Sequence, residues 1–202
     1  MTYSIIIVQD HKIGIGVVSG SVAVGSRVPY IRYPHCGIVS QGYTNPALSP
    51  IIADLIERGE RAKSALNKAL RLDTDPEARQ VAVLTANLDK AIHVGAKVPL
   101  NKGAYMDHDF IVVANLVEED VVKSMANAAK SKKDLSVRLY EALLAGNAVG
   151  GDLRGDRSAT LLIHGKTPFS PYYNVILDVR VDYSKAPLRD LRRILEAYGV
   201  HL

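Results

Sequence analysis

The chain has 202 residues, of which 48% are hydrophobic and 23% are charged, and its formal net charge is +4. This composition excludes a disordered chain, and the hydrophobic runs are far shorter than the roughly 20 residues of a membrane-spanning helix. The length predicts a single domain over residues 1–202 with a sizeable core. The one cysteine, Cys36, excludes an internal disulfide and a cysteine-rich zinc site.

Several classes of partner are also disfavoured. Tryptophan is absent, phenylalanine occurs twice, and the positive charges are spread along the chain, so we expect no nucleic-acid partner. No basic leader precedes a hydrophobic stretch, which predicts a cytoplasmic protein without a membrane partner. The histidines lack the spacing of a metal site, and we expect neither metal nor cofactor. A small enzyme or a binding domain for a small molecule remains.

The first third of the chain is typical of β-structure. A strand is predicted over Tyr3–Gln9, a turn at Asp10–Lys12 and a glycine-containing strand over Ile13–Val24, which together indicate a hairpin. A third strand, Cys36–Gln41, ends in the turn cluster Gly42–Pro46.

Paired helices and further hairpins make up the middle. Hydrophobic residues at helical spacing predict two short helices, about 51–56 and 62–70. Three strands follow, at Gln80–Thr85, Ala91–Val94 and Asp109–Leu116.

The last third of the chain again combines paired helices with strands. Two helices are predicted over Glu118–Lys130 and Asp134–Ala145, then strands over Ala159–His164 and Val175–Val181, and a closing helix over Leu188–Tyr198. Eight strands joined largely by hairpins require mainly antiparallel sheets, and helices that come in pairs suit layers against those sheets. The pattern therefore predicts a layered α+β sandwich.

Thr2 is the first candidate for chemistry. Methionine aminopeptidase usually removes Met1 before a small residue, and an N-terminal threonine carries a nucleophile and a base on one residue. The α-amine has a reference pKa of about 7.7–8.0, close to ambient pH, so it can take the hydroxyl proton. A strand that begins at Tyr3 would hold this terminus still. The competing interpretation is an ordinary chain start without a catalytic role.

The second candidate is the polar loop Gly150–Ser158, which carries four charges and three glycines in nine residues. Its glycines expose backbone amides, and an Asp152–Arg154 pair can fix the loop or hold a substrate carboxylate. A solvated turn with a surface ion pair explains the same spacing.

Two further segments, Gly25–Pro29 and Gln41–Pro46, could line a polar pocket next to a strand. Ordinary turn chemistry, in which serine and asparagine bond their own backbone, explains them equally well.

Taken together, these segments resemble one family. The pieces that carry the resemblance occur in the family's order over nearly the whole chain: Met1-Thr2-Tyr3-Ser4-Ile5, Ala23–Pro29, Gln41–Pro46, Arg79-Gln80-Val81, His93-Val94-Gly95, Asn115-Leu116 and the Gly150–Ala159 loop. The sequence is similar to the domain-of-unknown-function 1028 family, which belongs to the N-terminal-nucleophile (Ntn) hydrolase superfamily.

The resemblance implies an αββα sandwich of two antiparallel sheets between helix layers. It also implies hydrolysis of an amide or related C–N bond in a small polar substrate, with Thr2 as nucleophile after removal of Met1, and we expect a homo-oligomer. Asp152 and Arg154 are the other catalytic candidates, with Asp152 orienting Arg154. By analogy, the substrate-binding candidates are Ser19, Ser21, Arg27, Gln41, Asn45, Asn115 and Ser158.

Two other functions are open on the same fold. A cyclohydrolase-like enzyme would need no processed terminus, because its pocket groups, Arg154 and Asn115 among them, would bind and polarise a carbonyl. A non-catalytic binding or assembly module would keep the fold without the chemistry. Fold-level analogy alone does not choose among the three.

Overall fold

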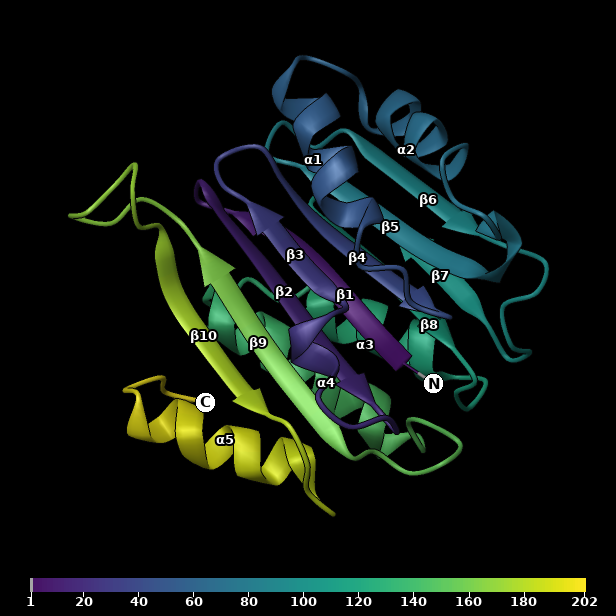
Figure 1. Ribbon diagram of the computed structural model, residues 1–202. Helices are drawn as coiled ribbons and strands as arrows, with labels where there is room; N and C mark the ends of the chain where they lie inside the picture. The colour runs from purple at the N-terminus through teal and green to yellow at the C-terminus, as the bar shows by residue number, and fades with distance from the viewer. Residues whose placement is uncertain (1) are drawn as a thin grey trace.

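The computed structural model describes residues 2–202 as two β-sheets that lie face to face between layers of helices (Figure 1). In spatial order, the six-stranded sheet contains β10 (Val175–Val181), β9 (Ser158–His164), β2 (Lys12–Ser19), β1 (Thr2–Gln9), β8 (Phe110–Asn115) and β7 (Gly103–Met106). The four-stranded sheet contains β3 (Pro29–Arg32), β4 (Cys36–Gly42), β5 (Arg79–Thr85) and β6 (Lys90–Val94). Every strand pair in both sheets is antiparallel.

Helices cover the outer face of each sheet (Figure 1). The four-stranded sheet is covered by α1 (Leu48–Glu57) and α2 (Ala62–Leu70), and the six-stranded sheet by α3 (Val121–Ala129), α4 (Leu135–Ala148) and α5 (Pro187–Ala197). Two short 3-10 turns, η1 (Val24–Ser26) and η2 (Pro76–Ala78), lie in the connections. The predicted α+β sandwich with four αββα layers is confirmed.

The hydrophobic core has three layers, because side chains that alternate along each strand are buried on both faces of the sheets. On β1, Tyr3, Ile5 and Ile7 pack toward α3 and α4, whereas Ile6 and Val8 face the second sheet. Successive side chains point to opposite faces of a strand, so a strand buried on both faces carries an almost continuous hydrophobic run. A third group of buried residues packs between α1, α2 and the four-stranded sheet.

The β1–β2 hairpin has a local cause. Asp10 and His11 have positive φ angles of 50° and 58°, the left-handed conformation at both central positions of a tight hairpin turn. Asp tolerates this conformation well. The turn sets the register in which Thr2 pairs with Ser19, so it positions the far end of the hairpin.

Two strands were missing from the sequence prediction, and one predicted strand is too long. Pro29–Arg32 and Gly103–Met106 are edge strands of four residues, too short to show a pattern of alternation. The strand predicted over Ile13–Val24 ends at Ser19, because Gly20 leaves the sheet beside Asp152 and Ala23 adopts a left-handed conformation with φ of 52°.

Candidate functional site

One end of the space between the sheets is polar. Each of the strands concerned places polar side chains on the face that looks toward the opposite sheet, while the rest of that face is lined by Ile, Val and Leu. These polar side chains are all buried and belong to Thr2, Ser4, Ser19, Gln41, Gln80, Asn115, Ser158 and Thr160. A dense set of buried polar groups must be hydrogen-bonded to be tolerated, and it marks this end as the candidate site.

Thr2 is the first residue of the described chain and lies in the middle of the six-stranded sheet. It pairs with Ser19 of β2 on one side and with Asn115 of β8 on the other, and its side chain is 6% exposed. The Thr2 Oγ1 lies 3.1 Å from the Ser19 Oγ. The Ser21 amide donates to that same Ser19 oxygen at 3.0 Å. The hydroxyl is therefore held in place on a rigid strand.

The predicted ion pair of Asp152 and Arg154 contacts Gly20, the residue that follows Ser19. The buried Asp152 accepts hydrogen bonds from the Gly20 amide at 2.7 Å and from the Arg154 amide and guanidinium at 3.0–3.1 Å. Burial works to raise the pKa of the Asp152 carboxyl, but hydrogen bonds from Arg154 and Gly20 outweigh it and keep the pKa below its ordinary value. Asp152 is thus a carboxylate at neutral pH.

Gly20 allows this contact because it has no side chain. A Cβ at position 20 would lie 2.7 Å from the Asp152 Oδ1, closer than any stable contact. The Arg154 side chain, which is 38% exposed, reaches the Ser21 Oγ at 3.4 Å. The loop that follows α4 is thus joined to the end of β2, about 130 residues earlier in the sequence.

Ser158 fixes the other side of this turn. Its hydroxyl donates to the Ser21 carbonyl at 2.6 Å and accepts from the Val24 amide at 3.2 Å. Since Ser158 pairs with Ser19 across β9 and β2, its role in the structure is to hold the turn after β2.

Three buried carboxamides lie on the other side of Thr2. The Gln41 Nε2 donates to the Thr2 carbonyl at 3.2 Å and to the Gln80 Oε1 at 2.8 Å. The Asn115 Nδ2 donates to the same Gln80 oxygen at 2.7 Å, and Ser4 donates to the Gln41 Oε1. This network connects the two sheets directly behind Thr2.

The sequence interpretation missed two members of this region. Gln80 is the centre of the amide network, and its signal in the sequence was a polar residue directly before the hydrophobic run Val81–Leu84. Asp156 accepts hydrogen bonds from the Tyr3 hydroxyl and from Asn147. Burial, and then the charge of Asp156, raise the pKa of Tyr3 well above its ordinary value.

The structure does not bring two predicted residues to this cluster. Arg27 donates to the Val22 and Ala23 carbonyls at 2.9 Å and stays within its own turn. Asn45 donates to Asp73 at 2.8 Å and caps a local turn through the Ala47 amide. Both contacts are ordinary turn chemistry, the competing interpretation of these segments.

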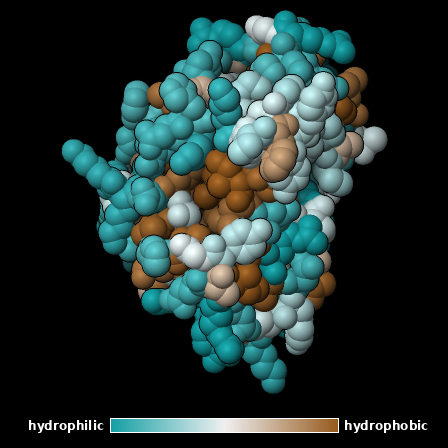
Figure 2. Space-filling view, turned by 90° about the vertical axis from the view of Figure 1, so that its left-hand side faces the viewer, coloured by the Kyte–Doolittle hydropathy of each residue, from teal (hydrophilic) through white to brown (hydrophobic). Residues whose placement is uncertain are grey.

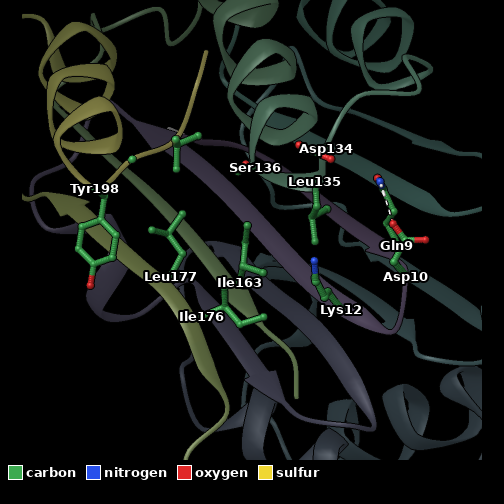
Figure 3. Close-up of a pocket in the computed structure, with 12 residues that line it drawn as sticks. Gln9, Asp10, Lys12, Asp134, Leu135, Ser136, Ile163, Ile176, Leu177 and Tyr198 are labelled. Carbon is green, nitrogen blue, oxygen red and sulfur yellow. Dashed lines mark hydrogen bonds between the residues drawn. The ribbon is translucent and has the colours of Figure 1, made fainter. Parts of the chain in front are cut away.

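A separate cavity of about 350 Å³ opens at the opposite end of β1 and β2. Its wall includes Lys12, Leu135 and Ile163, with Leu177 and Tyr198 close by (Figure 3). Figure 2 shows the side of the molecule that carries β10, where hydrophobic residues form the floor of a hollow within a polar surround. The lining of the cavity shares no residue with the cluster around Thr2.

One solved crystal structure agrees with the architecture. A crystal structure of a DUF1028 protein from Silicibacter pomeroyi superposes with a TM-score of 0.89 at 23% identity, covering 99% of this chain and 87% of that one. Anbu, described as an ancestral beta-subunit, from Yersinia bercovieri gives a TM-score of 0.49 at 10% identity, covering 99% and 98%. No curated protein matches the sequence.

Two further findings complete the description. None of the helices within residues 2–202 has the length and hydrophobicity needed to cross a membrane. The family model described as "Family of unknown function (DUF1028)" matches residues 2–191, nearly the whole chain. The resemblance drawn from the sequence motifs is confirmed: the chain belongs to the DUF1028 family.

Proposed function

We propose that the protein is an N-terminal-nucleophile hydrolase that cleaves an amide or related C–N bond of a small polar substrate, with Thr2 as nucleophile. One observation carries the proposal. The Thr2 hydroxyl lies at the start of a central strand, 3.1 Å from the Ser19 hydroxyl, and the Asp152–Arg154 pair is bonded to Gly20, the residue that follows β2. A nucleophile needs such a fixed, hydrogen-bonded position.

The reaction begins with removal of Met1, a residue that lies outside the described part of the chain. The freed α-amine of Thr2 takes the proton from its own hydroxyl as the Oγ1 attacks the substrate carbonyl carbon. The C–N bond then breaks, the amine passes that proton to the leaving nitrogen, and an ester to Thr2 remains. Water hydrolyses the ester by the same route and restores the hydroxyl.

Asp152 and Arg154 have distinct roles in this scheme. The Asp152 carboxylate lies beside Gly20, next to the residue that pairs with Thr2, so it stabilises the positive charge that the amine gains when it takes the hydroxyl proton. The partly exposed Arg154 guanidinium offers a fixed positive charge to a polar substrate group. Ser19, Ser21, Gln41, Asn115 and Ser158 complete the proposed substrate-binding set, through direct contact or by holding the turn after β2.

The proposal also covers the substrate, the partners and the location of the protein. The substrate is a small molecule, the reaction uses no cofactor or metal, and the protein works as a homo-oligomer in the cytoplasm without nucleic-acid or membrane partners. Arg27 and Asn45, which bond within their own turns, contribute to loop structure and are left out of the proposed site.

The test combines mass and activity. Intact mass of the purified native protein is expected to lack Met1. A panel of small amides, followed by release of the amine, is expected to give turnover that falls by about 10³-fold or more in Thr2→Ala and is partly kept in Thr2→Ser. Ser26→Ala, an exposed hydroxyl outside the cluster, is the matched control. Retained Met1 in active protein, or full turnover in Thr2→Ala, would contradict the proposal.

A second candidate, a cyclohydrolase-like enzyme without a terminal nucleophile, is favoured by the amide network. Gln41, Gln80 and Asn115 form a buried polar wall whose hydrogen bonds do not depend on a free terminus. In that enzyme the wall and Arg154 would bind and polarise a carbonyl. Ring opening or closing that persists in Thr2→Ala would support it. Ligand binding without any turnover would instead support a non-catalytic module.

A further inference from the structure

The hydrogen bonds around Gln80 fix the orientation of three carboxamides. The Gln80 Nε2 donates to the carbonyls of Ala114 and Gly103 at 3.0 and 3.2 Å, and a carbonyl can only accept. The Gln80 Oε1 must therefore face the other way, toward Gln41 and Asn115. Both neighbours then have to present their amide nitrogens to it, at 2.8 and 2.7 Å.

These hydrogen bonds also fix the orientation of the Asn115 side-chain oxygen. Because the Asn115 Nδ2 is held by Gln80, its Oδ1 points away from the network, and flipping the amide would oppose two oxygens. Within residues 2–202, no group donates to the Asn115 Oδ1, although the residue is 0% exposed. A buried acceptor without a donor is costly and rare in a native protein, and it calls for a specific explanation.

The orphaned acceptor lies beside the proposed nucleophile. Asn115 is the residue that pairs with Thr2 across β8 and β1, and directly paired side chains on one face of an antiparallel sheet lie about 5 Å apart at their Cβ atoms. Both side chains face the second sheet, as the contact of the next even residue of β1, Ser4, with Gln41 shows. The oxygen is thus within reach of a group that is bonded to Thr2.

We propose that the Asn115 Oδ1 is a binding group reserved for the N–H of the scissile amide, so that the substrates are primary or secondary amides rather than esters. This inference rests on the proposed function. When the Thr2 oxygen attacks the carbonyl carbon, the amide nitrogen lies one bond away from the reacting centre, where the N–H can donate to the Asn115 oxygen. An ester carries no hydrogen at that position and leaves the buried acceptor unpaired.

Access to this acceptor is narrow in the described part of the chain. Thr2 and Asn115 are 6% and 0% exposed, so a substrate needs space at the start of β1 before it can reach them. In the proposed function, cleavage of the bond before Thr2 frees the amine that the reaction requires.

The first arm of the test measures stability without any substrate. The unpaired Oδ1 contributes nothing to folding, so Asn115→Leu loses only the hydrogen bond from its Nδ2 to Gln80 and is expected to lower the melting temperature by about 3 °C or less. The matched control Gln80→Leu removes the group that binds Gln41, Asn115, Ala114 and Gly103, and it is expected to lower the melting temperature by about 6 °C or more. An equal loss in both variants would make Asn115 a structural residue and overturn the inference.

The second arm compares an anilide with the phenyl ester of the same acyl group. The amide-to-ester ratio of kcat/KM is expected to fall about 100-fold in Asn115→Leu, because only the anilide loses a hydrogen bond. An unchanged ratio overturns the inference. Thr2→Ala, which is expected to lose turnover of both substrates, tests the proposed function separately. If the wild type hydrolyses neither substrate, the proposed function fails, and a binding measurement then tests the inference. Acetanilide, but not phenyl acetate, is expected to raise the melting temperature of the processed protein, and this effect is expected to be lost in Asn115→Leu. Equal stabilisation by both compounds, or none by either, overturns the inference.

Discussion

At the scale of single residues, the notable feature is how many polar side chains are buried around Thr2. The sequence indicated Thr2, Ser19, Ser21, Asp152, Arg154 and Ser158, and the structure joins these in one chain of hydrogen bonds. Gln80, although part of the motif Arg79-Gln80-Val81, was not among the predicted site residues, because a single glutamine near a strand end looks the same in the sequence whether it is exposed or buried. Their catalytic roles stay predictions until the Thr2 variants are measured.

Asp152 makes stability depend on pH. Its pKa is lower in the folded protein than the roughly 3.9 of an unfolded chain, so its stabilising contribution is present above about pH 4 and is lost as the pH falls through the folded-state pKa. Asp152→Asn is expected to lower the free energy of unfolding by about 2 kcal/mol at pH 7, since the amide nitrogen that replaces one carboxylate oxygen cannot accept the hydrogen bonds that reach that oxygen. Urea unfolding at pH 7 and pH 3 measures this difference.

The expected result is a difference between wild type and Asp152→Asn that is smaller at pH 3 than at pH 7. The exposed variant Asp178→Asn controls for the loss of one negative charge. A destabilisation of the same size at both pH values would show that the carboxylate charge is not what stabilises the loop.

At the scale of elements, the packing of α4 on the central hairpin depends on missing side chains. A Cβ at Gly14 would lie 2.6 Å from the Leu139 side chain, and one at Gly16 would lie 3.0 Å from Leu143. The leucines of α4 therefore pack directly on the backbone of β2. Glycines inside a strand often mark such close approaches.

A double-mutant cycle tests this contact. Leu139→Ala is expected to cost about 2–5 kcal/mol because it leaves a cavity, and Gly14→Ala about 1–3 kcal/mol because the added methyl group overlaps Leu139. In the double variant the new methyl group enters the space that Leu139 vacates, so the two costs are expected to fall short of additivity by about 1–2 kcal/mol. Urea unfolding gives all four free energies, and strict additivity would contradict direct contact.

At the scale of the whole molecule, the two sheets share one hydrophobic layer. Ile6, Ile15 and Ile111 of the six-stranded sheet pack with Val39 and Leu84 of the four-stranded sheet. Neither sheet can leave without exposing this layer to water. The expected homo-oligomer stays a prediction.

Unfolding is therefore expected to be a single cooperative transition over the whole chain. Far-UV circular dichroism follows the helices and sheets, and the near-UV signal of the ten tyrosines follows tertiary packing. The two urea curves are expected to coincide for the non-aggregated protein. Two separated transitions would show that the four-stranded unit and the six-stranded unit are independent domains, against the predicted single domain.

The sequence by itself determined what depends on neighbours along the chain. The hydrophobic runs of β1 and β8, the turn at Asp10 and His11 and the helical spacing of α5 each favour one local structure through residues that are close together in the sequence. Only the tertiary structure decided which of these elements meet. Gly20 and Asp152 are 132 residues apart, and Gln80 and Asn115 are 35 apart on different sheets. Strand order and register bring such pairs together, because they arise from the packing of all layers at once and leave no periodic signal in the chain.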